Sequence, residues 1–306
     1  MAGAGPGAGH VPLRHLLLGL AVVIVWGTNF VVIRVALEQL PPLAFAALRF
    51  TLAFLPAALF IRRPRVRWRD LAGYGVLIGA GQFGLLFIAM DGLISPGLAS
   101  LVVQSQVFFT IGLAMAFRGE RVKPVQLVAL VMATAGIGVI VAHGGGAATP
   151  LGLALVVAAA LSWAGGNHVA KASGVTDMLA FVVWSSMFAV PPLVLAAVLL
   201  EGWQPIATAV AQATPATWAA VVWQSVGNSL FGYAAWGWLL ARHPAATITP
   251  LAMLVPVFGM GASALLLGEA LPGWKLDAGA LVLGGLALNI LWPLAGRIPW
   301  RRGAGA

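Results

Sequence analysis

The chain has 306 residues, of which 61% are hydrophobic and 8% are charged. Soluble globular domains carry about 25% charged residues, so this composition excludes an ordinary soluble fold and indicates a protein embedded in a membrane. The formal net charge is +9, which taken alone would also suit a protein that binds nucleic acid. The absence of cysteine excludes disulfide bonds, thiol catalysis and cysteine-based metal sites.

Ten apolar segments follow one another along the chain, each near the length that an α-helix needs to cross a bilayer. The first begins beside Arg14 and His15, like a signal peptide, but it continues past Trp26 without a small-x-small cleavage pattern. It is therefore predicted to be the first membrane helix. Proline and glycine mark many of the breaks between segments. The ten predicted spans are 13–37, 42–61, 70–90, 96–117, 124–142, 150–172, 177–200, 216–241, 245–268 and 273–295.

The basic residues predict how the helices are oriented. If the N-terminus is cytoplasmic, most of the 17 Lys and Arg fall in cytoplasmic segments, and only Lys275 falls in an external one. Arg34 and Arg49 lie within the first two helices. The positive charge is then a topology signal, with anionic lipid head groups as contacts, and no nucleic-acid partner is expected. Both termini are predicted to be cytoplasmic.

Several sequence markers occur twice in the same order. Trp26 and Trp163 open similar stretches, and Gly-Glu pairs end the fourth and ninth predicted helices. Each half thus contains five helices, and because five is odd, the second half is inverted relative to the first. We expect a first repeat at 1–146 and a second at 147–306. Inverted repeats are typical of secondary transporters, whose substrate site lies between the halves; the alternative is chance similarity among oily segments.

The motifs that carry these markers resemble a known family. They are WGTNF at 26–30, PPLAFAALRF at 41–50, GERV at 119–122 and LGEAL at 267–271. Over about residues 13 to 295 the chain resembles the drug/metabolite transporter superfamily of EamA type, and within it most closely the aromatic-amino-acid exporter branch. The resemblance implies an all-α membrane protein with ten helices around a central cavity, which moves amino acids and related metabolites out of the cell. The two repeats differ where Arg49 aligns with Ser185.

Polar side chains inside the predicted helices are candidates for lining the cavity, because lipid cannot satisfy them. Trp163 and Asn167 are one helical turn apart on the sixth helix, with His168 beside them. Trp163 offers a stacking surface for a flat or apolar side chain. The alternative is that such residues only join helices through hydrogen bonds. The predicted substrate-binding residues are Asn29, Gln82, Gln104, Trp163, Asn167, His168, Gln224 and Asn228.

Three charged residues are assigned gating or structural roles. Arg49 could bind a substrate carboxylate, although a structural role between helices is the preferred interpretation. Glu120 and Glu269 follow helix C-termini, where the helix dipole disfavours acids, so each must have a local partner. For Glu120 we expect Arg121 or Lys123, and for Glu269 we expect Lys275.

Several kinds of functional group and motif are absent from the sequence, and their absence disfavours some functions. All eight carboxylates fall at helix ends or in loops, which disfavours both a carboxylate proton relay and a site for cationic drugs. The sequence has no phosphate-binding loop, HExxH motif or GxSxG motif, so no enzyme activity, cofactor or metal is expected. We therefore predict a monomeric secondary transporter of the bacterial inner membrane. It would export aromatic and other apolar amino acids by alternating access, as a uniporter or weakly coupled through His168.

Two alternative functions stay open at this point. Within transport, the chain would export cationic drugs or other metabolites. Outside transport, it would be a membrane scaffold or a membrane-embedded enzyme.

Overall fold

The computed structural model describes residues 11–118, 123–143, 145–243 and 245–295. Within these ranges the chain forms helices and short loops, with no β-strand and one isolated bridge between Ile94 and Ala148. The elements in chain order are α1 (Leu13–Leu37), α2 (Pro42–Ala58), α3 (Trp68–Val76), η1 (Leu77–Gly84), α4 (Leu85–Met90), α5 (Pro96–Val102), η2 (Val103–Ser105), α6 (Gln106–Arg118), α7 (Pro124–His143), η3 (Gly145–Ala147), α8 (Pro150–Ser173), α9 (Met178–Leu200), α10 (Trp203–Gln212), α11 (Pro215–Val222), η4 (Trp223–Phe231), α12 (Gly232–Arg242), α13 (Ala245–Ile248), η5 (Thr249–Leu254), α14 (Val255–Leu267) and α15 (Gly273–Ala295).

Eight helical runs in the described residues are long and apolar enough to cross a membrane. Some combine consecutive elements, as in Trp68–Met90, which joins α3, η1 and α4. The second and eighth predicted spans are also helical, but they are not among these eight runs. α2 is apolar but has only 17 residues, about 25 Å of helix, and the run from α11 to α12 covers 215–242. The all-helical membrane fold is confirmed, and the helix bounds agree with the predicted spans to within a few residues.

Local sequence signals explain where many helices begin and end. Proline occupies the first turn of α2, α5, α8 and α11, where its missing N–H needs no partner. Thr149 and Asp177 cap α8 and α9 by accepting bonds from the backbone N–H of Gly152 and Ala180. Gly268 ends α14 in the left-handed region at φ +67, which a residue with a Cβ rarely adopts.

Four runs change helix type partway along, and the changes come in two matching pairs. η1 and η4 are π-helical segments in the third and eighth predicted spans. η2 and η5 are 3₁₀ segments in the fourth and ninth. π-helical turns inside α-helices are rare and occur frequently at functional sites. The same irregularities thus fall at corresponding places in the two halves of the chain.

The packing pairs also match between the halves. α1 packs against α14 and α12, whereas α8 packs against α6 and against η1 and α4. α2 packs against α9, and α7 packs against α15. Close approach depends on small residues at two of these contacts. A Cβ on Gly75 would overlap the backbone oxygen of Ser185 on α9, and a Cβ on Gly27 would overlap α14 at Phe258.

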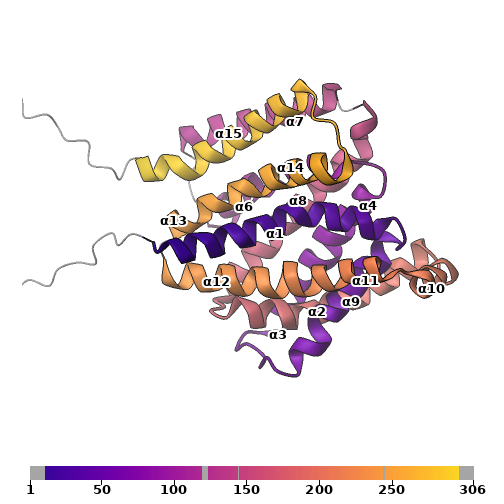
Figure 1. Ribbon diagram of the computed structural model, residues 1–306. Helices are drawn as coiled ribbons and strands as arrows, with labels where there is room; N and C mark the ends of the chain where they lie inside the picture. Colours follow the sequence, from indigo (N-terminus) through magenta and orange to yellow (C-terminus); the bar gives the residue numbers. More distant parts are fainter. Residues whose placement is uncertain (1–10, 119–122, 144, 244, 296–306) are drawn as a thin grey trace, which may run out of the picture.

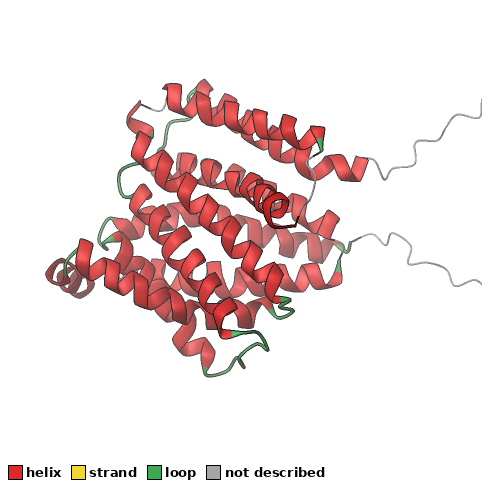
Figure 2. Cartoon of the chain, turned by 180° about the vertical axis from the view of Figure 1, so that it is seen from behind, coloured by secondary structure: helices red, strands yellow, loops and turns green. Residues whose placement is uncertain are grey.

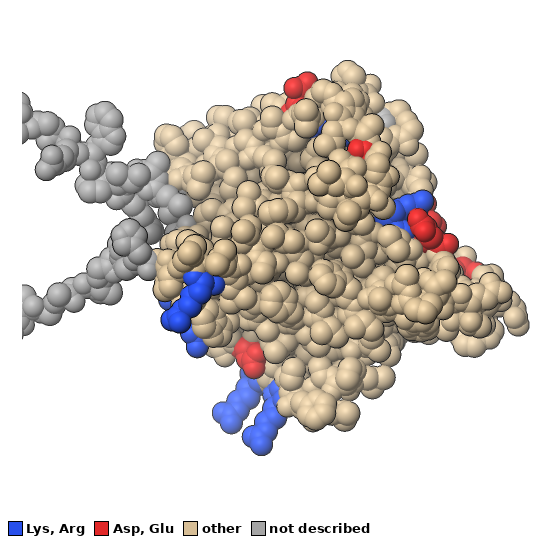
Figure 3. All heavy atoms as spheres, in the orientation of Figure 1, with Lys and Arg blue, Asp and Glu red and all other residues tan. Residues whose placement is uncertain are grey.

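The bundle has two chemically different ends, which are separated on one face by a band without charged side chains (Figure 3). α1 begins and α15 ends at one end, on the left of Figure 1, and α10 lies at the other; Figure 2 shows the same arrangement from behind. We call these ends the terminal side and the α10 side. On the face drawn in Figure 3, most Lys and Arg atoms gather near the terminal side and below it, and a broad tan band without charge separates them from the α10 side. Large aliphatic side chains are exposed on this chain, such as Leu265 at 85%, which suits contact with lipid.

The sequence did not predict α10. This helix of 10 residues is too short to span a bilayer and was included in the loop after the seventh span. It begins after Gly202, whose φ of +84 turns the chain sharply away from the end of α9.

Candidate functional site

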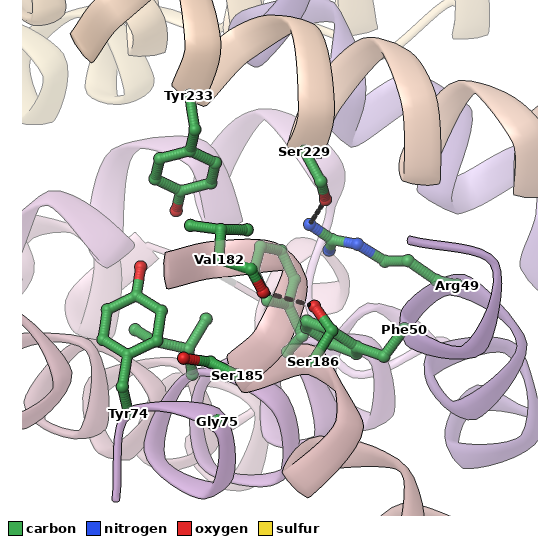
Figure 4. Close-up of a pocket in the computed structure, with 11 residues that line it drawn as sticks. Arg49, Phe50, Tyr74, Gly75, Val182, Ser185, Ser186, Ser229 and Tyr233 are labelled. Atoms are coloured by element: carbon green, nitrogen blue, oxygen red, sulfur yellow. Dashed lines mark hydrogen bonds between the residues drawn. The ribbon is translucent and has the colours of Figure 1, made fainter. Parts of the chain in front are cut away.

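A small pocket lies inside the bundle where α2, α3 and η1 meet α9, η4 and α12. We call it the Arg49 pocket (Figure 4). Its volume is about 10 Å³, which is room for about one water molecule. The pocket itself is therefore nearly closed in this structure. The lining residues are Arg49, Phe50, Tyr74, Gly75, Ile78, Phe83, Val182, Ser185, Ser186, Ser229 and Tyr233.

Arg49 is the charged residue of this pocket, and only 1% of it is exposed. Its Nη2 donates a hydrogen bond to Ser229 Oγ at 3.1 Å, while Nε and Nη1 have no partner among the described residues. The guanidinium lies 3.5 Å from the ring centroid of Phe83, which supplies a cation–π contact. Buried charges in proteins are ordinarily paired, and no described Asp or Glu lines this pocket. Arg49 thus holds a buried positive charge without a carboxylate.

Neutral hydroxyl groups make up the other polar surface of the pocket. The hydroxyls of Tyr74 and Tyr233 point toward one another on the side opposite Arg49 (Figure 4). Ser185 Oγ is buried and has no partner among the described residues. Ser186 Oγ donates to the backbone oxygen of Val182 at 2.8 Å, so its hydrogen is already used. The pocket can therefore offer neutral hydroxyl oxygens to a guest, but no anion.

The π-helical segment η4 fixes the position of Arg49. Ser225 Oγ lies 2.9 Å from the backbone oxygen of Arg49 and 2.8 Å from that of Val221, so its hydrogen is shared between the two helices. Ser229 Oγ donates to the backbone oxygen of Gln224 five residues earlier, at 3.1 Å, and accepts from Arg49. Both serines thus join α2 to η4 beside the pocket.

None of the eight predicted substrate-binding residues lines the Arg49 pocket. Five of them are buried elsewhere in the bundle: Asn29, Gln82, Gln104, Gln224 and Asn228. Both amide atoms of Gln224, and the side-chain oxygens of Asn29 and Gln82, have no partner among the described residues. These five positions stay predicted cavity residues.

The three predicted residues on α8 form a separate group. Trp163, Asn167 and His168 are half-buried. Asn167 Nδ2 donates to Gln106 Oε1 at 3.4 Å, and the His168 ring lies 5.2 Å from that of Phe117. The last two therefore face α6. Sequence spacing correctly placed Trp163 and Asn167 on one helix, but it could not specify which neighbour that helix would contact.

Glu269 joins the two halves of the chain at the α10 side. It accepts bonds from Ser95 Oγ at 2.5 Å and from the backbone N–H of Gly97 at 3.0 Å, at the start of α5. Lys275 Nζ donates to Glu269 Oε1 at 2.9 Å, as predicted. Glu120, the other acid assigned to gating, lies outside the described residues.

Glu201 makes a second connection of the same kind, which the sequence analysis missed. It follows α9 and accepts bonds from the backbone N–H groups of Leu43 and Ala44, at 2.6 and 3.0 Å. These groups belong to the first turn of α2, where a carboxylate is favoured by the helix dipole. Burial raises the pKa of Glu201 above its ordinary value, the two N–H bonds oppose that rise, and Asp91 adds to it. Both carboxylates thus cap helices of the first half from the second half, at the same end of the bundle.

Comparison with known proteins identifies relatives along nearly the whole chain. The model of the EamA-like transporter family matches twice, at residues 13–142 and 150–291. The chain is 39% identical over 279 residues to a probable amino-acid metabolite efflux pump of Salmonella typhimurium, covering 89% of this chain and 93% of that protein. It is 38% identical over 280 residues to the Escherichia coli K12 protein of the same name, covering 90% and 94%. A probable terminal-alkyne amino-acid exporter of Streptantibioticus cattleyicolor is 28% identical, with 87% and 90% covered.

A solved crystal structure has a similar fold. It matches with a TM-score of 0.64 and covers 94% of this chain and 100% of that chain. The two sequences are 20% identical, so the likeness concerns the fold alone.

Proposed function

Because the chain belongs to the EamA-like transporter family, we propose that it exports amino acids and related metabolites across a bacterial inner membrane by alternating access. It is a multi-pass membrane transporter and not an enzyme. The Salmonella and Escherichia coli relatives are named as probable amino-acid metabolite efflux pumps, which supports amino-acid-like cargo and the outward direction. The finer features of substrate and mechanism are argued below from the residues.

The halves are proposed to be inverted repeats of five spans each. The two family matches, one in each half, support this division at 1–146 and 147–306. The paired π segments η1 and η4 and the paired 3₁₀ segments η2 and η5 support it independently, because such irregularities rarely recur at corresponding places by chance. On this proposal, α2 and the run 215–242 are the remaining two of ten membrane helices. The run 215–242 is long enough to span by itself, whereas α2, at about 25 Å, spans only if it tilts little and the bilayer thins around it.

The observation that carries the transport proposal is the position of the Arg49 pocket between the halves. Residues of α2, α3 and η1 form one wall, and residues of α9, η4 and α12 form the other. A site with walls on both repeats changes its accessibility when one repeat moves against the other. The nearly closed volume fits a conformation in which neither side is open to a substrate.

We propose an orientation with the termini in the cytoplasm and the α10 side outside. Arginines and lysines concentrated near the terminal side support this orientation through the positive-inside rule. The Glu201 and Glu269 contacts then close the external face. Outward opening would require both carboxylates to release the helices that they cap.

The pocket favours amino acids with apolar or aromatic side chains. Phe50, Ile78, Phe83 and Val182 supply apolar walls, and Phe83 supplies an aromatic face. The buried guanidinium of Arg49 opposes the alternative of cationic drugs, because it would repel them. With no described carboxylate in the pocket to carry a proton, we propose uniport, or weak coupling through His168.

The proposal is tested with purified protein in liposomes and a panel of radiolabelled amino acids. Flux is measured in both directions, with protein-free liposomes as the control, and with and without an imposed pH gradient. We expect protein-dependent flux of apolar and aromatic amino acids that changes little with the pH gradient. Absence of protein-dependent flux for every member of the panel, under every gradient, would overturn the proposal.

A further inference from the structure

We propose that Arg49 binds the carboxylate of the transported molecule, and that the pocket recognises this group rather than the amino group. The inference rests on the proposed transport function and specifies its substrate class. The expected substrates are monocarboxylates that carry an apolar or aromatic side chain. An α-amino group would be accepted but not required.

The first step in the argument is the state of the Arg49 guanidinium. It is buried, it touches Phe83 face-on, and its one hydrogen bond goes to a neutral hydroxyl, Ser229 Oγ. Burying an arginine without an anion is unfavourable, since neither an aromatic face nor a hydroxyl replaces a counter-charge. A guest carboxylate would supply that missing charge. A positively charged guest would raise the electrostatic energy of the site instead.

The second step is the set of hydrogens that Arg49 leaves available. Nη1 has no partner among the described residues, so both of its hydrogens are free, and Nη2 uses one of its two hydrogens on Ser229. The two Nη atoms can therefore bind both oxygens of a carboxylate at once. Paired bonds of this kind are characteristic of arginine with carboxylates and are roughly twice as strong as bonds between neutral groups.

The third step concerns what faces an amino group. The described acids lie at helix ends or on the surface, and none of them lines the Arg49 pocket. An ammonium group would find the oxygens of Tyr74, Tyr233 and Ser185, which are neutral. Hydroxyls also donate hydrogen bonds, so the same three groups suit a neutral hydroxyl or amide on the guest. Recognition is therefore asymmetric, with a charged partner for the carboxylate and neutral partners for the opposite end.

The apolar walls of the pocket set a further requirement on the substrate. Phe50 and Phe83 flank the guanidinium, with ring centroids 5.0 and 3.5 Å from its central carbon. A dicarboxylate would bring a second negative charge against these walls with no second cation in the pocket. The site thus selects one carboxylate attached to an apolar body.

The experiment compares four molecules that share one side chain. For phenylalanine they are phenylalanine itself, 3-phenylpropionate without the amino group, phenethylamine without the carboxylate, and phenylalaninamide with the carboxylate neutralised. If another panel member shows the highest flux, the same four forms of that amino acid are used. Binding to purified protein in detergent is measured by competition with the labelled amino acid, because the neutral forms of these probes cross lipid unaided.

We expect 3-phenylpropionate to compete within about tenfold of phenylalanine, and phenethylamine and the amide to compete roughly 10- to 100-fold more weakly. Arg49→Gln should weaken binding of both acids by a similar factor, and it should not weaken binding of the amine or the amide, because it removes a positive charge that repels their ammonium groups. Arg34→Gln is the matched control, since Arg34 lies in a separate cleft at the α10 side, and it should keep the wild-type order. Size-exclusion profiles and thermal unfolding verify that each variant is folded.

The outcomes separate this inference from the proposed function. If phenethylamine competes as strongly as 3-phenylpropionate in the wild-type protein, the carboxylate assignment is wrong even though transport stands. If no amino acid shows flux or binding, the proposed function itself fails. The wild-type comparison decides the matter even if Arg49→Gln does not fold, and Arg49→Lys then tests the residue, because it keeps the charge but loses the paired geometry.

Discussion

The Glu201 carboxylate accepts a hydrogen bond from the backbone N–H of Leu43 at 2.6 Å, so the end of α9 caps the beginning of α2. Its second oxygen accepts from Ala44, which satisfies another N–H of the first turn. The contact lies at the α10 side, where Glu269 caps α5 in the same way. The first and second halves are thus tied together at one end by two carboxylates.

Glu201→Gln should favour opening of the α10 side. The amide keeps one acceptor oxygen but presents an NH₂ group to the second backbone N–H, so one N–H group of the first turn of α2 loses its partner. Losing a capping interaction of this kind costs about 1 kcal/mol, a several-fold change in the ratio of open to closed states. Spin labels on cysteines at Glu38 and Gln212, both exposed at the α10 side, should report a larger population at long distance.

The control for this experiment is Asp277→Asn in the same labelled background. Asp277 is an exposed carboxylate near the start of α15 and caps no helix of the other half. An identical distance distribution for Glu201→Gln and Asp277→Asn would contradict the assignment of Glu201 to closure.

On the proposed orientation, external acid should favour the closed α10 side. Burial raises the pKa of Glu201 in the closed state, whereas opening would expose the group to water and return its pKa toward the ordinary value. The closed state therefore binds the proton more tightly. Above both pKa values the buried charge opposes closure, and this penalty disappears as pH falls through the closed-state pKa. The long-distance population should shrink as the pH falls from neutral toward the ordinary pKa range of a glutamate, and Glu201→Gln should abolish this dependence. A dependence that survives in Glu201→Gln would assign the titration to another acid of that side.

Breaking the ion pair between Lys275 and Glu269 should destabilise the protein, because both side chains are largely buried. Removing one partner of a buried pair leaves an uncompensated charge and typically costs about 3–5 kcal/mol. We expect Lys275→Met to lower the thermal unfolding temperature clearly, and the double variant Lys275→Met, Glu269→Gln to recover part of the loss. Arg67→Gln is the matched comparison, since the Arg67 side chain is 58% exposed in its pair with Asp70, and it should change stability little. Equal losses for Lys275→Met and Arg67→Gln would contradict this account.

The sequence predicted the helices well because their signals are local. Proline at the first turn of α2, α5, α8 and α11, and glycine after α14, mark boundaries that depend on the backbone of a few neighbouring residues. The Lys275–Glu269 pair was also predictable, because the two residues lie six positions apart and a short loop joins their helices.

The site was harder to predict because it depends on contacts between distant helices. Arg49 was recognised as unusual, but only the packing of α2 on α9 and η4 reveals that its guanidinium lacks an acid. The π segments η1 and η4 change which side chains of the third and eighth helical runs point inward. No pattern in the sequence predicted these segments. In the sequence, Glu201 resembles any acid at a helix end, and only the structure shows that it accepts a hydrogen bond from the start of α2. The site therefore depends on contacts between residues more than 150 positions apart in the sequence, and local sequence patterns do not predict such contacts.

Gly75→Ala should impair both packing and transport. An added Cβ would overlap the backbone oxygen of Ser185, so α3 and α9 would have to separate beside the Arg49 pocket. Overpacking of this kind costs about 1–3 kcal/mol. Gly73→Ala is the matched control two residues earlier on the same helix, because its Cβ would meet Val169 at an ordinary contact distance of 3.7 Å. Reduced flux and thermal stability in Gly75→Ala alone would support the close approach, and equal behaviour of the two variants would contradict it.

The α8 group tests whether the substrate path extends beyond the Arg49 pocket. Trp163→Ala and Asn167→Ala should reduce amino-acid flux while the protein remains folded, if the predicted cavity lining is correct. Because Asn167 bonds to Gln106 on α6, its loss could also act through packing alone. The distinguishing measurement is competition by 3-phenylpropionate. If the α8 residues line the path without touching the substrate carboxylate, their variants should change flux but keep the wild-type ratio of 3-phenylpropionate affinity to phenethylamine affinity. Arg49→Gln should change that ratio. Wild-type flux in both α8 variants would remove these residues from the transport path and leave the Arg49 pocket as the candidate site.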